Sequence, residues 1–175
     1  VDLPDDLTQP GDKGPLAGTA TTRPAPPRGV VQRRLTFTAS RKYPGLQGTR
    51  HWLRSSPDGS RIAFLMRDDD GHSQIWTISP NGGEPKQLTH NAFDVGSTFS
   101  WSPDGKQIAY VADNSVFVAN SETGNSTRLT SHTESTRAPR PEACVFSPDG
   151  HHIAYVRRVP SKQGEFNQIF IVAAQ

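Results

Sequence analysis

Six histidines are the side chains of this sequence best suited to metal binding or proton transfer. A protein-bound zinc ion needs several donor atoms about 2 Å away from it. Only two of the histidines are adjacent, and no His-x-His pair occurs among them: His51, His72, His90, His132, His151 and His152. The sequence therefore favours no metal site, and we expect neither a metal nor another cofactor.

Five polar side chains at the ends of predicted loops are better candidates for a ligand-binding site. These loops connect three repeated units and span residues 38–50, 91–97 and 132–141. Binding residues concentrate in loops that a rigid frame holds in place. The first and third loops are long and contain Arg and His, which suit an anionic or carbohydrate ligand. We predict no catalytic residue and the following ligand-binding residues: Arg50, His51, Ser97, Arg140 and Glu142.

Two further stretches contain residue types that could bind a metal or react, but their sequences are more typical of a turn and of a buried strand than of a functional site. The stretch "RDDDGHSQ" (67–74) lacks the alternating ligands and the final Glu of a calcium-binding EF-hand loop, and Asp-Gly is a common hairpin signal. The single cysteine, Cys144, lies in an apolar run, which is typical of a small buried side chain. One cysteine also excludes an intramolecular disulfide. No P-loop or G-x-S-x-G nucleophile motif is present.

Composition narrows the class of protein. The 175 residues suit one domain of ordinary size, with 33% hydrophobic residues, a mean hydropathy of -0.63 and a net charge of +2. Lys and Arg are scattered, so nothing indicates a nucleic-acid partner. No apolar run approaches the ~20 residues of a membrane helix, so we expect no membrane insertion. The chain begins with Val1, and a targeting segment could have been removed from it.

Residues 1–29 differ from the rest of the chain. They contain six Pro, four Gly and no aromatic residue. Such a composition buries too little apolar surface to offset the entropy lost on ordering. We predict a flexible Pro/Gly-rich tail or loop over 1–29, followed by a folded region over 30–175.

Three near-copies of one unit follow, about 45 residues apart. Each has a strand (51–55, 98–101, 142–146), an SPDG turn (56–59, 102–105, 147–150), an apolar second strand (61–66, 107–112, 152–157) and a third strand (74–79, 115–120, 168–173). A fourth strand ending in Leu-Thr is expected at 33–37, 86–90 and 127–131. Four strands per ~45 residues is the spacing of a β-propeller blade.

The SPDG turn has a mechanical explanation. Proline sets φ for a type I turn, aspartate can accept hydrogen bonds from nearby backbone N–H groups, and glycine supplies the left-handed residue that closes the hairpin. The strand that follows is apolar on both faces, as expected where a neighbouring blade packs on each. We therefore predict that these copies build the frame and carry no chemistry.

The order of the strands predicts an incomplete propeller. The last unit stops after its third strand, whereas the Leu-Thr strand at 33–37 has no unit before it. We predict an all-β fold, a partial propeller of about three four-stranded antiparallel blades whose last blade lacks its outer strand. Closed propellers have at least about four blades. We therefore expect missing blades, or self-association through exposed edges.

The repeated unit resembles the WD40-like repeats of the TolB family, the periplasmic propellers of the Tol–Pal system. The residues that carry the resemblance are W/F-S-P-D-G-x-x-I-A-Y/F, then I-W/F-x-I/V and Leu-Thr, over 51–175. In addition, "PAPPRGVVQRRLTFT" (24–38), "RHWLRSSPDGSRIAFLMRDDDG" (50–71) and "GGEPKQLTHN" (82–91) are similar to the C-terminal part of uncharacterised enterobacterial YidR-type proteins. This second resemblance implies a longer chain and a larger propeller.

Three functions are open at this point. The resemblance implies a non-catalytic binding scaffold, with protein–protein interaction in a Tol-type biopolymer transport context and a periplasmic or otherwise cytoplasmic location. The same repeat occurs in oligogalacturonate lyases, where several His and a Gln hold a metal, and in peptidase propellers. A lyase is disfavoured because His151 and His152 follow an SPDG turn, at the other end from His51. A peptidase would need a hydrolase domain elsewhere.

Overall fold

The computed structural model describes residues 2–47 and 53–174, and the chain forms two compact units, Val1–Leu35 and Thr36–Gln175. Among the described residues, the second unit contains all the named strands together with the short 3-10 helix η2 (Ser135–Arg137). Over the described residues, no helix is long and apolar enough to cross a membrane.

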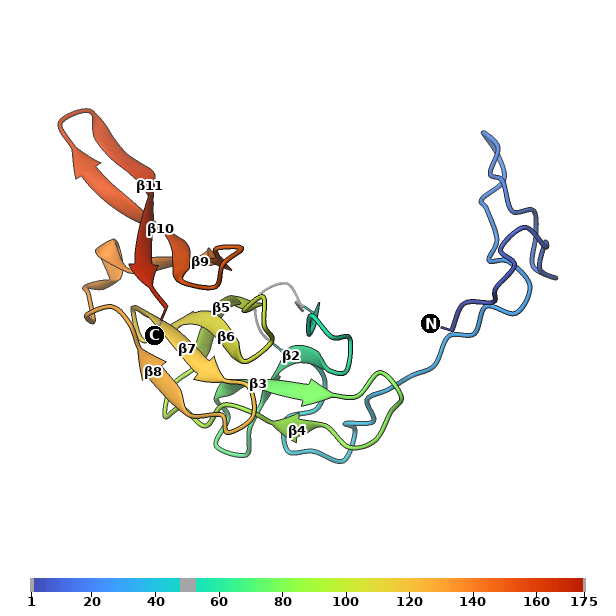
Figure 1. Ribbon diagram of the computed structural model, residues 1–175, viewed down its shortest axis with the longest axis horizontal. Helices are drawn as coiled ribbons and strands as arrows, with labels where there is room; N and C mark the ends of the chain where they lie inside the picture. The colour runs from blue at the N-terminus through green and yellow to red at the C-terminus, as the bar shows by residue number, and fades with distance from the viewer. Residues whose placement is uncertain (1, 48–52, 175) are drawn as a thin grey trace. The chain divides into compact units, whose positions relative to one another are not determined.

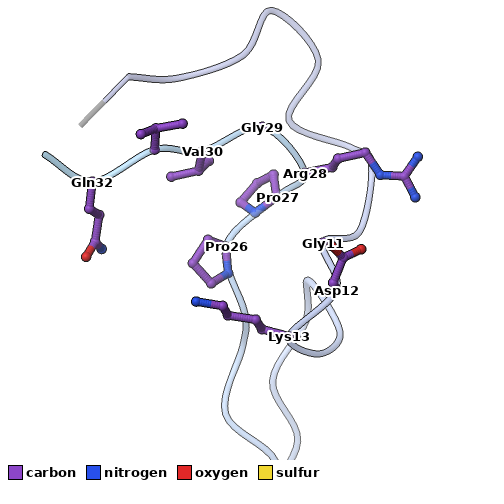
Figure 2. A pocket seen from close by; sticks show the side chains of 10 residues that line it. Gly11, Asp12, Lys13, Pro26, Pro27, Arg28, Gly29, Val30 and Gln32 are labelled. Atoms are coloured by element: carbon purple, nitrogen blue, oxygen red, sulfur yellow. The ribbon is translucent and has the colours of Figure 1, made fainter.

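The first unit has little regular structure. Isolated bridges join Asp2 to Val31 and Pro10 to Pro27, and Arg33 forms an ion pair with Asp2 at 2.9 Å. Lys13 reaches toward Pro26 at the wall of a hollow of about 540 Å³ (Figure 2). The unit extends to Leu35, six residues beyond the predicted tail, and its flexibility stays a prediction.

The second unit is built from three antiparallel sheets whose strands follow chain order (Figure 1). Sheet 1 contains β1 (Arg54–Ser55), β2 (Ile62–Arg67), β3 (Ser73–Ile78) and β4 (Lys86–Gln87). Sheet 2 contains β5 (Val95–Trp101), β6 (Gln107–Ala112), β7 (Ser115–Asn120) and β8 (Ser126–Arg128). Sheet 3 contains β9 (Pro139–Phe146), β10 (His152–Ser161) and β11 (Gly164–Ala173). The predicted fold class, a partial propeller whose last blade has three strands, is confirmed.

Several predicted boundaries were wrong. Residues 33–37 form no strand, because an outer strand needs a third strand to pair with and the described residues supply none there. β5 and β9 begin earlier than expected, at Val95 and Pro139, so the loops that precede them are shorter. β10 and β11 form a hairpin that extends beyond β9, whose pairing with β10 reaches only Arg157.

The SPDG turns repeat one hydrogen-bond network three times. In the second copy, Gly105 N–H donates to the carbonyl of Ser102 at 2.9 Å, and the Ser102 hydroxyl donates to Asp104 at 2.7 Å. Asp104 also accepts the Lys106 N–H at 3.0 Å. Gly105 has φ +72°, a left-handed conformation that glycine adopts without strain. The other two copies make the same bonds, which confirms that the turn residues build the frame.

The Leu-Thr pair clamps the third strand of each complete sheet. In sheet 1, Leu88 N–H donates to the Ile75 carbonyl at 2.9 Å, while the Thr89 hydroxyl accepts the Ile75 N–H at 2.9 Å. In sheet 2, Leu129 and Thr130 make the same two bonds to Val116, at 2.8 and 2.9 Å. The threonine side chain thus replaces a backbone acceptor at the end of a very short outer strand.

Two apolar cores lie between successive sheets. Leu65 and Ile75 of sheet 1 pack with Phe99, Ile108 and Tyr110 of sheet 2. The opposite face of sheet 2 packs against sheet 3 through the following residues: Ala109, Val111, Val116, Val118, Cys144, Phe146, Ile153 and Tyr155. The second strand β6 is therefore buried on both faces, as the sequence predicted.

Candidate functional site

Each sheet has a turn end, where its SPDG turn lies, and an opposite end, here called the loop end. The loop end contains the turn between the second and third strands and the connection to the next sheet. Because the turn ends are nearly identical, chemical variety is found at the loop ends, and the candidate site is built there.

The structure brings together two of the five residues predicted to bind a ligand. Arg140 and Glu142 lie on β9 and form an ion pair at 3.2 Å, with Glu142 exposed. The Thr98 hydroxyl of β5 donates to the Glu142 carbonyl at 3.2 Å, which fixes this part of β9 against sheet 2. Arg50 and His51 lie outside the described residues.

Ser97 has a structural part in the sheet. Its side chain is completely buried in β5, where its hydroxyl donates to the carbonyl of Thr98 and accepts the Val111 N–H at 2.7 Å. The pairing of β5 with β6 shifts register between Val95 and Phe99, and Ser97 fills this irregularity. We therefore leave Ser97 out of the candidate site.

The loop end of sheet 2 adds a cluster of ionisable side chains that sequence reasoning missed. Asp113 lies in a two-residue hairpin turn and contacts both Arg128 and His132, with a His132 Nε2 to Asp113 distance of 3.5 Å. The hydrogen bond from Arg128 lowers the pKa of Asp113, which favours the carboxylate. Asn114 donates to the Thr133 carbonyl at 2.9 Å and thereby ties the following connection to this turn.

The loop end of sheet 3 supplies further cations. Arg157 Nε donates to the Arg137 carbonyl at 2.8 Å, and its guanidinium lies 5.2 Å from the centre of the Phe170 ring. Arg158 forms an ion pair with Glu165 at 3.6 Å. Arg157 is paired with Pro139 across the β9–β10 ladder, so these cations lie on the strands beside Arg140.

The loop end of sheet 1 contains the aspartate-rich stretch. Asp68 accepts the N–H groups of Asp70 and His72, at 3.1 and 2.8 Å, which confirms a turn. Asp94 accepts the Ser73 N–H at 2.7 Å and lies 3.8 Å from His72. Within residues 2–47 and 53–174, no group of three or more His, Cys, Asp or Glu residues could hold a metal ion.

The loop that precedes sheet 1 packs on the same end. Arg41 lies 4.5 Å from the Trp76 ring centre and donates to the Arg67 carbonyl at 3.1 Å. Lys42 donates to the Asp69 carbonyl at 3.0 Å.

The single cysteine lies away from the loop ends. Cys144 is buried between sheets 2 and 3, and this burial raises the pKa of its thiol to about 12, so the thiol stays protonated.

The candidate site is therefore the loop end of sheets 2 and 3, defined by Asp113, His132, Arg140, Glu142 and Arg157. Its carboxylates and guanidinium groups are held by neighbouring side chains or backbone groups. Such an arrangement can bind charged or hydroxyl-rich groups by hydrogen bonds and ion pairs. No local sequence motif marks this site, because Asp113 and His132 come from different connections.

Comparison with known proteins agrees with this fold. The family model of the dipeptidyl peptidase IV N-terminal region matches residues 96–169. The uncharacterised protein YidR of Escherichia coli K12 is 52% identical over 159 residues, which cover 89% of this chain and 38% of YidR. The chain thus resembles YidR over most of its length, as expected from its sequence.

Two solved structures have the same architecture. A putative TolB from Agrobacterium tumefaciens superposes with a TM-score of 0.52 and 29% identity, over 68% of this chain and 40% of that one. An oligogalacturonate lyase from Vibrio parahaemolyticus superposes with a TM-score of 0.50 and 14% identity, over 65% of this chain and 30% of that one. The lyase shows the fold alone. The chain spans two fifths or less of each of these proteins.

Proposed function

We propose that this chain is a non-catalytic β-propeller binding module that binds its ligand at the loop ends of its sheets. The observation that carries the proposal is the contrast between the two ends of the sheets. At the turn ends, SPDG makes the same hydrogen bonds three times, so those residues are committed to the frame. At the loop ends each sheet presents a different pair of ionisable side chains.

The resemblance to TolB supports a protein partner in a Tol-type biopolymer transport context, and a periplasmic location would follow from such a role. The charges at the candidate site support an anionic or saccharide ligand, because guanidinium groups bind carboxylates with directed hydrogen bonds. Arg140 and Glu142 are the residues that we propose to contact it. Arg50 and His51 stay predicted members of the same site.

The proposal is tested against the lyase alternative with trigalacturonate, an anionic sugar. The chain is incubated with this substrate, with and without Mn²⁺, and the unsaturated elimination product is measured by its ultraviolet absorbance. We expect no product in either case. Product that requires Mn²⁺ and is lost in the His51→Ala variant would establish an enzyme instead, with metal analysis of the purified chain as a second readout.

A further inference from the structure

The connection between β3 and β4 contains a fourth, altered copy of the SPDG turn. Its sequence is Ser-Pro-Asn-Gly, residues 79–82, so an asparagine stands where the other copies have an aspartate. The Gly82 N–H donates to the Ser79 carbonyl at 3.0 Å, just as Gly105 donates to Ser102 at 2.9 Å. Gly82 has φ +99° and Gly105 has φ +72°, both in the left-handed region. The backbone turn of SPDG is thus present at residues 79–82.

The side-chain network of the turn is missing from this copy. In the second SPDG copy, the Ser102 hydroxyl and a backbone N–H two residues after the aspartate donate to the Asp104 carboxylate, at 2.7 and 3.0 Å. In the asparagine copy, the Ser79 hydroxyl instead accepts the Asn81 N–H at 3.1 Å. Among the described residues, the Asn81 side chain and the Gly83 N–H form no hydrogen bond. A carboxylate at position 81 would therefore find two donors in its own turn.

The residue after Asn81 makes this asparagine chemically distinct. It is the only asparagine of the chain that a glycine follows. An asparagine loses its side-chain amide when the next backbone nitrogen attacks Cγ and closes a five-membered ring, and glycine permits the backbone rotation that this ring needs. Asn81 is exposed, and no heavy atom beyond the adjacent residues lies within 4 Å of the Cβ position of Gly82 or Gly83. The surrounding structure thus leaves room for the ring.

Other asparagines are held by hydrogen bonds that oppose this reaction. The Asn114 side chain donates to the Thr133 carbonyl at 2.9 Å, and serine follows it in the sequence. The Asn120 side chain accepts the N–H groups of Glu122 and Thr123, both at 2.9 Å, and serine follows it too. These bonds must break before Cγ can meet the next nitrogen. The structure therefore favours reaction at the Asn-Gly pair.

We propose that Asn81 is a site of spontaneous deamidation and that the resulting aspartate completes a fourth SPDG turn. The Gly82 nitrogen bonds to Cγ of Asn81, and the side-chain nitrogen leaves as ammonia with the proton that the Gly82 nitrogen gives up. Water then attacks Cγ and breaks its bond to the Gly82 nitrogen, which takes a proton from that water. The product has an intact backbone, an aspartate side chain and one additional negative charge.

The product gains hydrogen bonds that Asn81 lacks. The Ser79 hydroxyl and the Gly83 N–H donate to the new carboxylate, as their counterparts do in the SPDG turns. Hydrogen bonds to an ionised acceptor are roughly twice as strong as neutral ones, so the turn becomes more stable. Because the Gly82 N–H is bonded to the Ser79 carbonyl, the turn must open before the ring closes. The modification lies at the turn end, so it is independent of ligand binding at the loop end.

A timed incubation in mildly alkaline buffer, followed by digestion and mass spectrometry, tests the modification. We expect the fragment that contains residues 79–82 to gain the mass of deamidation at least about fivefold faster than any other fragment with an asparagine. Fragmentation should identify aspartate at position 81. Asn81→Gln, whose longer side chain closes a ring far more slowly, should abolish the gain at this fragment.

A synthetic peptide of residues 74–88 is the unstructured control for the same reaction. It should deamidate faster than the folded chain, because no turn has to open first. Absence of a mass gain at residues 79–82 while the peptide reacts would overturn the proposal. Formation of isoaspartate alone, by attack of water on the backbone carbonyl carbon of the ring, would overturn it as well.

Asn81→Asp supplies the product directly and tests the completed turn. We expect a higher urea midpoint at pH 7 for this variant than for the original chain. Ser79→Ala should lower the midpoint more in the Asn81→Asp background, because only there does the hydroxyl donate to a carboxylate. Asn125→Asp, at an exposed asparagine near β8, is the matched control and should not raise the midpoint. Equal effects of Ser79→Ala in both backgrounds would show that no fourth SPDG network forms.

Discussion

The guanidinium of Arg61 donates to the backbone carbonyl of Ser121 at 2.7 Å, and this bond joins the turn end of sheet 1 to that of sheet 2. Arg61 also forms an ion pair with Glu122 at 3.0 Å and lies 5.2 Å from the Trp101 ring centre. A single side chain therefore connects two sheets through three kinds of interaction. Sheets without covalent links depend on such contacts, together with their apolar cores, for a fixed orientation.

Replacing Arg61 should weaken the contact between sheets 1 and 2. We expect Arg61→Ala to lower the free energy of unfolding by about 1–2 kcal/mol, because a charge-assisted hydrogen bond and a stacked contact are lost. Lys106→Ala is the control, since Lys106 is exposed and its ion pair with Asp104 is 3.9 Å long. Urea denaturation measures both variants, and equal losses would contradict the role of Arg61.

The Leu-Thr clamp predicts an asymmetry between two threonines. Thr89 is completely buried and accepts the Ile75 N–H, whereas Thr127 on β8 is exposed. Thr89→Val should therefore lower the free energy of unfolding by about 2–3 kcal/mol, because a buried N–H loses its acceptor. Thr127→Val should cost less than about 0.5 kcal/mol. Thermal or urea unfolding distinguishes them, and a neutral Thr89→Val would refute the clamp.

Gly124, which precedes β8 of sheet 2, lies against the backbone of Leu88, which follows β4 of sheet 1. It has φ +74°, and an added Cβ would overlap the backbone oxygen of Leu88. Gly59 has a similar φ of +71°, but open space surrounds its Cβ position. Gly124→Ala should therefore cost at least about 2 kcal/mol more than Gly59→Ala, since only the former adds a collision to the shared backbone strain. Similar losses of stability would contradict this contact.

The turn aspartates predict loss of stability in acid. Hydrogen bonds, above all from the Ser56 hydroxyl, lower the pKa of Asp58 from 3.8 to about 2, and those from Ser102 and Ser147 lower the pKa values of Asp104 and Asp149. The unfolded chain binds these protons at higher pH, so the stabilisation is complete above pH 3.8 and disappears as the pH falls toward 2.

Urea unfolding at pH 5, 4, 3 and 2 measures this effect. The free energy of unfolding should fall mainly below pH 4. Ser56→Ala should reduce the steepness of that fall, because the pKa of Asp58 then moves toward its ordinary value. A free energy that does not change between pH 4 and 2 would be inconsistent with the observed turn network.

The buried thiol predicts slow chemical modification. Cys144 is 2% exposed, and burial raises its pKa to about 12, so the folded chain contains little thiolate at pH 8. A disulfide reagent should label it only after denaturation. Rapid labelling of the native chain at pH 8 would show that sheet 3 separates from sheet 2 in solution.

The sequence predicted those parts of the fold that local chemistry determines. The SPDG turns could be found because Pro, Asp and Gly act within four residues, and the β6 strand because it is apolar on both faces. Ser97 was misplaced because "NAFDVGS" has the composition of a loop, while pairing of Val95 with Ala112 extends β5 into it. A register shift caused by a distant strand leaves no local signal.

The candidate site was only partly predictable for the same reason. Arg140 and Glu142 are two residues apart on one strand. Both lie at the end of the predicted loop 132–141, so predicting where that loop ends was enough to identify both as candidate ligand-binding residues. Asp113 and His132 meet because a tight turn and a connection 19 residues later pack together, held by Asn114 and Thr133. Contacts of this kind depend on the packed structure.

The most direct test of ligand binding at the loop end is a map of amide chemical shifts during titration with trigalacturonate. We predict saturable shifts at His132, Glu142 and Arg157, a weaker response in Arg140→Ala, and unchanged amides at Gly59, Gly105 and Gly150 of the turn ends. Shifts confined to those glycines, or none at saturating sugar, would contradict the binding site and ligand class proposed for this chain.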